Sequence, residues 1–184
     1  MNVIAGKYKG RKLVTLEGDN TRPTLTRVKE DVFNIINNYF VYENKRVLDL
    51  FSGSGALGIE CISRGTGHVV FNDTNKDARE IILANLKEID DTSYSILDRD
   101  YLDLINKYKD NGFDLMFIDP PYSKTDYYEN VFESINNTSI LNNFGIIICE
   151  SNSLLTPQFI KNLVLLKYKK YKKTHLYIWR LELD

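Results

Sequence analysis

Five short apolar runs alternate with helical patterns through the middle of the chain. The runs have the length and β-branched content of buried strands, and apolar residues between them recur every three or four positions. The runs cover residues 46–51, 69–73, 94–98, 113–119 and 145–150. The helical patterns between them cover residues 56–64, 75–86, 101–108 and 127–136. This alternation predicts a parallel sheet with helices on both faces.

The two ends of the chain differ from this middle. A helix is expected over residues 26–39, and the alternating stretch "NVIAGKYKGRKLVTL" before it predicts a small N-terminal β-hairpin. Near the other end, "NLVLLKYKKY" and "THLYIWRLEL" have the pattern of an antiparallel hairpin that closes the sheet edge. We therefore expect an α/β, Rossmann-like, seven-stranded and mostly parallel sheet. This layout is typical of class I S-adenosylmethionine-dependent methyltransferases.

Length and composition limit the number of domains and the class of protein. A chain of 184 residues with 43% hydrophobic residues predicts one domain over residues 1–184, in which 1–25 form an N-terminal hairpin extension. No segment approaches the roughly 20 apolar residues that span a bilayer, so we expect a soluble, cytoplasmic protein without a membrane partner. We also expect a monomer. Cys61 and Cys149 lie far apart and lack metal-ligand spacing. No metal site or disulfide is expected.

A glycine-rich turn follows the first run of the sheet. Gly53-Ser54-Gly55-Ala56-Leu57-Gly58 fits the G-x-G-x-x-G pattern of dinucleotide-binding turns, and Asp73 follows about 20 residues later. NAD enzymes and S-adenosylmethionine enzymes both meet these conditions. Asp49 favours the second class, because a carboxylate in an apolar strand needs a partner and S-adenosylmethionine carries an ammonium and a sulfonium.

This interpretation gives each acidic residue a part of the cofactor. Asp49 would face the amino-acid end of S-adenosylmethionine, and Asp73 would accept hydrogen bonds from the ribose. Asp100 could accept from the adenine amine with Tyr101 beside it, although an ordinary helix cap explains Asp100 equally well. The predicted cofactor-binding residues are Asp49, Phe51, Gly53, Ser54, Gly55, Asp73, Asp100 and Tyr101.

The fourth run ends in Asp119-Pro120-Pro121-Tyr122. An exocyclic amine on a nucleobase is a poor nucleophile because its lone pair is delocalised into the ring. If the Asp119 carboxylate and the Pro120 carbonyl each accept one N–H, the nitrogen becomes more pyramidal and its lone pair is directed at the methyl donor. Tyr122 offers a face on which the base can stack. These four residues are the predicted catalytic group.

The same motif is typical of amino-methyltransferases that act on adenine N6, cytosine N4 or guanine N2. The stretches "VIAGKYKGRKL", "TRPTLTRVKEDVFN", "LDLFSGSGALGIE" and "FIDPPY" together resemble the bacterial RsmD family from about Val3 to Leu181. The resemblance implies methylation of one guanine N2 in 16S rRNA, with S-adenosylmethionine as cofactor. The implied partner is 16S rRNA in the small ribosomal subunit or in its assembly intermediate.

The resemblance also implies that the N-terminal hairpin contacts RNA beside the active site. Such contacts to phosphates fix the register and carry little sequence information. The predicted RNA-binding residues are Lys9, Arg11, Lys12, Arg22 and Arg27.

Two features depart from the family, and three other functions stay open. Lys172 stands in the last hairpin where family members commonly have glycine, and a net charge of −1 with a pI near 6.2 is low for an RNA enzyme.

The nearest alternative is an adenine-N6 methyltransferase acting on RNA or DNA. An RNA-binding assembly factor without catalysis and an NAD-dependent oxidoreductase are the others, and the oxidoreductase gives no role to the residues after the fourth run.

Overall fold

The computed structural model describes residues 1–16, 23–89, 93–121, 126–155 and 161–184. These fall into two units, Met1–Asp98 and Arg99–Asp184. Within the described ranges, no helix combines the length and the apolar character needed to cross a membrane.

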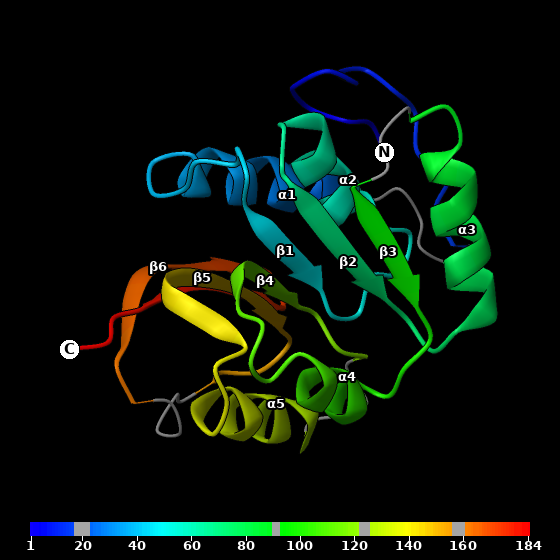
Figure 1. Ribbon diagram of the computed structural model, residues 1–184. Coiled ribbons are helices and arrows are strands. Elements are labelled where there is room, and N and C mark those ends of the chain that lie inside the picture. The colour runs from blue at the N-terminus through cyan, green and yellow to red at the C-terminus, as the bar shows by residue number, and fades with distance from the viewer. Residues whose placement is uncertain (17–22, 90–92, 122–125, 156–160) are drawn as a thin grey trace. The chain divides into compact units, whose positions relative to one another are not determined.

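Three parallel strands form the sheet of the first unit, in the order β3-β2-β1 (Figure 1). Both crossovers run in the same direction along the sheet, so right-handed connections place α2 and α3 on the same face. Val47, Leu48, Val69 and Val70 are fully buried and form the centre of this unit. The elements are α1 (Pro23–Ile36), β1 (Arg46–Asp49), α2 (Ala56–Ser63), β2 (His68–Asn72), α3 (Lys76–Leu86) and β3 (Tyr94–Leu97).

Residues 1–16, which we call the N-terminal segment, reverse direction as the sequence predicts. Their antiparallel pairing is confined to one bridge between Asn2 and Lys12, with the Val3 amide donating to the Arg11 carbonyl at 2.9 Å. The expected hairpin of two strands is therefore reduced to a bridged loop. One reason is that the Glu60 carboxylate of α2 accepts from the Ala5 amide, which the next rung of the ladder would have used.

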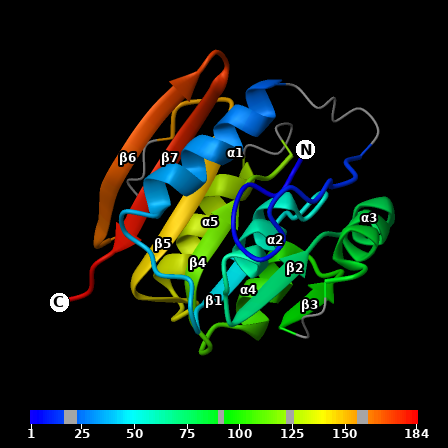
Figure 2. The same ribbon diagram turned by 90° about the horizontal axis from the view of Figure 1, so that it is seen from above.

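The second unit holds a four-stranded sheet in the order β4-β5-β7-β6, and Figure 2 shows β7 and β6 as neighbours at its edge. Strands β4 and β5 are parallel, whereas β7 runs antiparallel to both β5 and β6. The closing hairpin is thus confirmed. The elements are α4 (Tyr101–Lys107), β4 (Phe113–Ile118), α5 (Asp126–Asn136), β5 (Leu141–Ser151), β6 (Leu163–Tyr171) and β7 (Thr174–Leu181).

The helix expected over residues 26–39 begins and ends three residues earlier in the structure, at Pro23 and Ile36. Proline is common in the first turn of a helix, where its missing N–H has no partner to lose. After Ile36 the Asn38 amide donates to the Ile35 carbonyl, so the last predicted turn has i→i+3 geometry and does not continue the helix.

Candidate active site

The turn between β1 and α2 is fixed by Ser52. Its hydroxyl donates to the Asp49 carbonyl at 2.7 Å and accepts from the Asn72 amide at 2.9 Å. Its own amide donates to the Asn72 carbonyl at 2.9 Å. These bonds join the end of β1 to the end of β2, where ligands of parallel sheets usually bind.

Asp73 closes the turn from the end of β2. One carboxylate oxygen accepts from the Gly53 amide at 2.9 Å, and the other accepts from the Asn75 amide at 2.9 Å. Each carboxylate oxygen can accept a further hydrogen bond. Asp73 can therefore hold the turn and still bind a ribose hydroxyl, as the sequence predicts.

Asp49 lies beneath the same turn and is 3% exposed. Burial raises the pKa of its carboxyl to about 7; hydrogen bonding from the Gly58 amide, at 3.3 Å, opposes this rise, and the nearby charge of Asp73 adds to it. One hydrogen bond does little to offset the cost of burying a charged carboxylate, so a cation close to Asp49 would stabilise its ionised form. The ammonium of S-adenosylmethionine is a cation of this kind, so the residues present fit that cofactor.

The glycines of the turn serve different purposes. A Cβ added to Gly58 would come within 2.3 Å of the Phe71 ring, so this glycine allows α2 to approach β2 closely. A Cβ added to Gly53, which has a φ of 52°, would meet nothing within 4 Å, so the backbone there faces open space. The last glycine of the G-x-G-x-x-G pattern is explained by packing and requires no dinucleotide.

The first unit thus gathers most of the predicted cofactor residues around one turn. Phe51 is half-buried, and Gly55 is the N-cap residue of α2 with a φ of 75°. The Ser54 carbonyl accepts from the Asn85 side chain at 3.0 Å. The residues brought together are Asp49, Phe51, Gly53, Ser54, Gly55 and Asp73.

The remaining two predicted cofactor residues belong to the second unit. Asp100 caps α4 by accepting from the Leu102 amide at 2.9 Å, which is the alternative that the sequence left open. Tyr101 is 6% exposed and its ring centroid lies 4.4 Å from that of Tyr127. Its hydroxyl accepts from the Asn130 side chain at 3.0 Å. Tyr101 therefore packs α4 against α5.

The predicted catalytic group begins directly after β4. Asp119 is exposed, Pro120 is buried and Pro121 is exposed, while Tyr122 lies outside the described residues. Burial raises the pKa of the Cys149 thiol on β5, and the charge of Asp119 raises it further. The Asp119 carboxylate therefore stands near the carboxyl ends of both β4 and β5.

The predicted RNA-binding residues differ in their surroundings. Lys9, Lys12 and Arg27 are exposed, and Arg22 lies outside the described residues. Arg11 is half-buried: its guanidinium donates to the Lys87 carbonyl and lies 3.8 Å from the Glu88 carboxylate. Arg11 therefore also ties the N-terminal segment to the end of α3.

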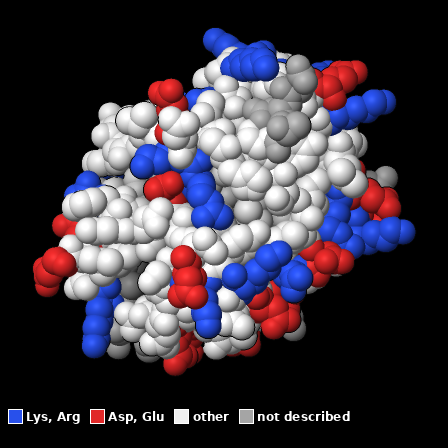
Figure 3. Space-filling model, viewed as in Figure 1, with Lys and Arg blue, Asp and Glu red and all other residues white. Residues whose placement is uncertain are grey.

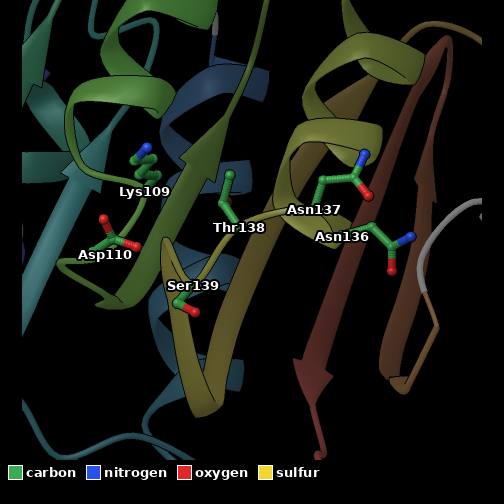
Figure 4. Close-up of a pocket in the computed structure, with 6 residues that line it drawn as sticks. All are labelled: Lys109, Asp110, Asn136, Asn137, Thr138 and Ser139. Atoms are coloured by element: carbon green, nitrogen blue, oxygen red, sulfur yellow. The ribbon is translucent and has the colours of Figure 1, made fainter.

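The second unit contains a pocket of about 480 Å³ (Figure 4). It is lined by residues that precede β4 and β5, whereas Asp119 follows β4. No predicted site residue lines it. The lining residues are Lys109, Asp110, Asn136, Asn137, Thr138 and Ser139.

One family model and several known proteins match nearly the whole chain. A family described as "Conserved hypothetical protein 95" matches residues 1–180. The chain is 35% identical over 184 residues to "Putative rRNA methyltransferase YlbH" of Bacillus subtilis, covering 98% of each chain. It is 32% identical over 178 residues to "Ribosomal RNA small subunit methyltransferase D" of Buchnera aphidicola, covering 95% of this chain and 89% of the relative.

Solved structures confirm the predicted class I methyltransferase fold. "Putative methyltransferase yhhF from Escherichia coli" matches with a TM-score of 0.86 and 24% identity, covering 100% of this chain and 99% of that one. SMU.776, described as "a putative methyltransferase complexed with SAH", matches with a TM-score of 0.69 and 18% identity, covering 84% of this chain and 48% of that one.

Proposed function

The chain belongs to the RsmD/YlbH family, described as conserved hypothetical protein 95, and we propose that it methylates the exocyclic N2 amine of a guanine in 16S rRNA. The observation that carries this proposal is the exposed Asp119 carboxylate followed by a buried proline at the end of β4. The substrate would be the small ribosomal subunit or its assembly intermediate, in the cytoplasm.

The cofactor of this methyltransferase family is S-adenosylmethionine. When bound, it supplies a methyl group that its sulfonium has already activated. In the first unit, Asp49 would pair with its ammonium and Asp73 would accept from its ribose hydroxyls. The open backbone at Gly53 leaves room beside the turn for such a molecule.

The second unit would hold the target amine. The Asp119 carboxylate and the Pro120 carbonyl would each accept one N–H, which leaves the nitrogen lone pair directed outward. Two consecutive prolines restrict the backbone that carries this carbonyl. Positioning of this kind matters more than a strong base, since the methyl donor is already activated. Asp119 would also take the proton that leaves the amine.

The choice of guanine N2 is supported by the likeness to a small-subunit rRNA methyltransferase over nearly the whole chain. Adenine N6 in RNA or DNA is the alternative, because the residues after β4 suit that amine equally well. Nucleoside mass spectrometry of 16S rRNA from cells with and without the protein separates the two. Loss of N2-methylguanosine supports the proposal, whereas loss of N6-methyladenosine alone replaces it with the alternative.

Substitution of Asp119 tests the catalytic assignment. Asp119→Ala should keep its melting temperature, because the side chain is exposed. It should also keep its affinity for S-adenosylhomocysteine, because Asp119 is proposed to bind the target amine and not the cofactor. Methyl transfer to small subunits that lack the modification should fall by about 100-fold or more. Asp103→Ala, which removes an exposed carboxylate from α4, should leave the rate unchanged. Normal turnover in Asp119→Ala would remove Asp119 from the mechanism.

A further inference from the structure

The N-terminal segment is held by side chains of α2. The Glu60 carboxylate accepts from the Ile4 amide at 2.8 Å and from the Ala5 amide at 3.0 Å. The Ser63 hydroxyl accepts from the Tyr8 amide at 3.0 Å and donates to the Ala5 carbonyl at 2.6 Å. These contacts bind the segment to the helix that begins immediately after the glycine turn.

Glu60 is also the centre of a buried charge cluster. It is 0% exposed, and its carboxylate lies 3.0 Å from the Lys29 ammonium of α1 and 2.9 Å from the Arg64 guanidinium. Lys29 in turn donates to the Asn2 carbonyl at 3.1 Å. The segment, α1 and α2 are therefore joined through the buried side chains of Lys29 and Glu60.

Asn85 on α3 makes a different kind of link. Its side-chain oxygen accepts from the Val14 amide at 2.7 Å. Its side-chain nitrogen donates to the Val14 carbonyl at 2.9 Å and to the Ser54 carbonyl at 3.0 Å. Both amide hydrogens are thus used, one on the N-terminal segment and one on the glycine turn. Asn85 itself is only 2% exposed, so its amide has little contact with water.

The two ends of this link have different proposed roles. Ser54 lies in the glycine turn, which is expected to bind the cofactor. Lys9 and Lys12 on the N-terminal segment are exposed and are expected to contact RNA. A shift of Val14 changes the position of the Asn85 amide and hence the donor to Ser54. The same amide transmits a shift of the turn back to the segment.

We propose that Asn85 is a positioning residue that couples RNA contact at the N-terminal segment to cofactor binding at the glycine turn. The inference rests on the proposed function and adds to it an energetic connection between the two binding events. Because such coupling is reciprocal, RNA should increase cofactor affinity by the same factor by which cofactor increases RNA affinity. A residue that only stabilised the fold would weaken both affinities and leave this factor unchanged.

Hydrogen–deuterium exchange with S-adenosylhomocysteine alone tests the link without RNA. In the wild-type protein, the ligand should slow exchange in the turn and also in residues 3–14. In Asn85→Ala, the ligand should still slow exchange in the turn, but protection should no longer extend to residues 3–14. Protection limited to the turn in the wild-type protein would overturn the proposal, whatever the stability of the variant.

Ser63→Ala is the matched control, because Ser63 binds the same segment and lies seven residues beyond the start of α2. This variant should exchange faster in the N-terminal segment, yet ligand should still protect that segment near Val14. If Ser63→Ala abolishes the protection as fully as Asn85→Ala does, general loosening explains the result and the specific role of Asn85 is refuted.

A second measurement compares the affinity for S-adenosylhomocysteine with and without unmodified small subunits. The wild-type protein should bind the ligand at least about fivefold more tightly with the subunits present. For Asn85→Ala this ratio should approach one. An unchanged ratio refutes the role of Asn85. A wild-type protein that neither binds nor methylates the subunits refutes the proposed function, while the exchange experiment still decides on Asn85.

Discussion

At the scale of single residues, Asp49 shows how burial determines chemistry. The carboxylate sits beneath the glycine turn with the Gly58 amide as a hydrogen-bond donor and the charge of Asp73 nearby. Its pKa of about 7 means that the unliganded protein holds this group partly protonated near neutral pH. A bound cation favours the ionised form, so cofactor binding should release a proton.

Cofactor affinity should therefore depend on pH. Above pH 7 Asp49 is already ionised, whereas below pH 7 binding of the ammonium must first remove its proton. Affinity for S-adenosylhomocysteine should fall by up to about tenfold for each pH unit below 7. Calorimetry at a series of pH values from about 5.5 to about 8.5 should show this dependence for the wild-type protein.

Asp49→Asn provides the comparison for that titration. Its affinity should be lower at pH 8 and should vary little with pH, because the amide does not titrate. Asp98→Asn removes an exposed carboxylate from the same unit and should keep the wild-type profile. Equal pH profiles for Asp49→Asn and the wild-type protein would show that another group titrates.

The sequence predicted those residues of the site whose positions follow from the order and spacing of the strands. The spacing of Asp49, Gly53 and Asp73 places all three at the carboxyl ends of adjacent strands, and the structure brings them together. Glu60 and Asn85 were missed, because their partners on the N-terminal segment and on the glycine turn lie 31 to 71 residues away. A signal was present for Asn85, which shares the buried face of α3 with Ala78 and Ile82.

At the scale of elements, the hairpin between β6 and β7 contains one departure from the family. Lys172 is the first residue of its two-residue loop and has a φ of 44°. Glycine adopts such a positive φ readily, whereas a residue with a Cβ is strained there. The chain therefore keeps a conformation suited to glycine with a lysine in place.

Replacing this lysine with glycine should stabilise the protein. We expect Lys172→Gly to raise the free energy of unfolding by about 1 kcal/mol, since it relieves the strain at the positive φ. Lys173→Gly, at the next position without a positive φ, should lower it by roughly 0.5 kcal/mol. Urea denaturation measures both. A destabilised Lys172→Gly would mean that the lysine side chain contributes more than the strain costs.

The ends of the helices and strands show where the local sequence pattern predicts the structure and where it does not. The helices and strands of the β-α alternation begin and end within one or two residues of the predicted positions, except β5, which begins at Leu141 and not at residue 145. Phe144 within it has a φ of 62°, and the register with β4 shifts between Phe113 and Leu115. Alternation cannot be followed through such an irregularity.

At the scale of the whole molecule, the charge is nearly balanced. Lysines and arginines are interspersed with acidic residues over the face shown in Figure 3, and the net charge is −1. A molecule of this kind has little long-range attraction for a polyanion. Affinity for RNA should therefore depend on a few local contacts, such as those expected from Lys9 and Lys12.

Reversal of these two charges should affect RNA recognition more than chemistry. Lys9→Glu/Lys12→Glu should raise KM for small subunits by about tenfold at low salt with kcat nearly unchanged. The dependence of log KM on log salt should weaken by about 0.7 for each phosphate that the variant no longer binds. Lys107→Glu/Lys109→Glu changes the net charge equally at exposed positions of the second unit and should leave KM unchanged. Equal effects of the two double variants would show that overall charge governs recognition.

The backbone partners of the N-terminal segment have a consequence for synthesis. The segment is synthesised before α2 and α3, and the side chains that bind Ile4, Tyr8 and Val14 are made 55 to 71 residues later. Contacts of such long sequence separation form only after the intervening chain has been synthesised. The N-terminal segment therefore becomes ordered only after α2 and α3, which hold it, have been synthesised.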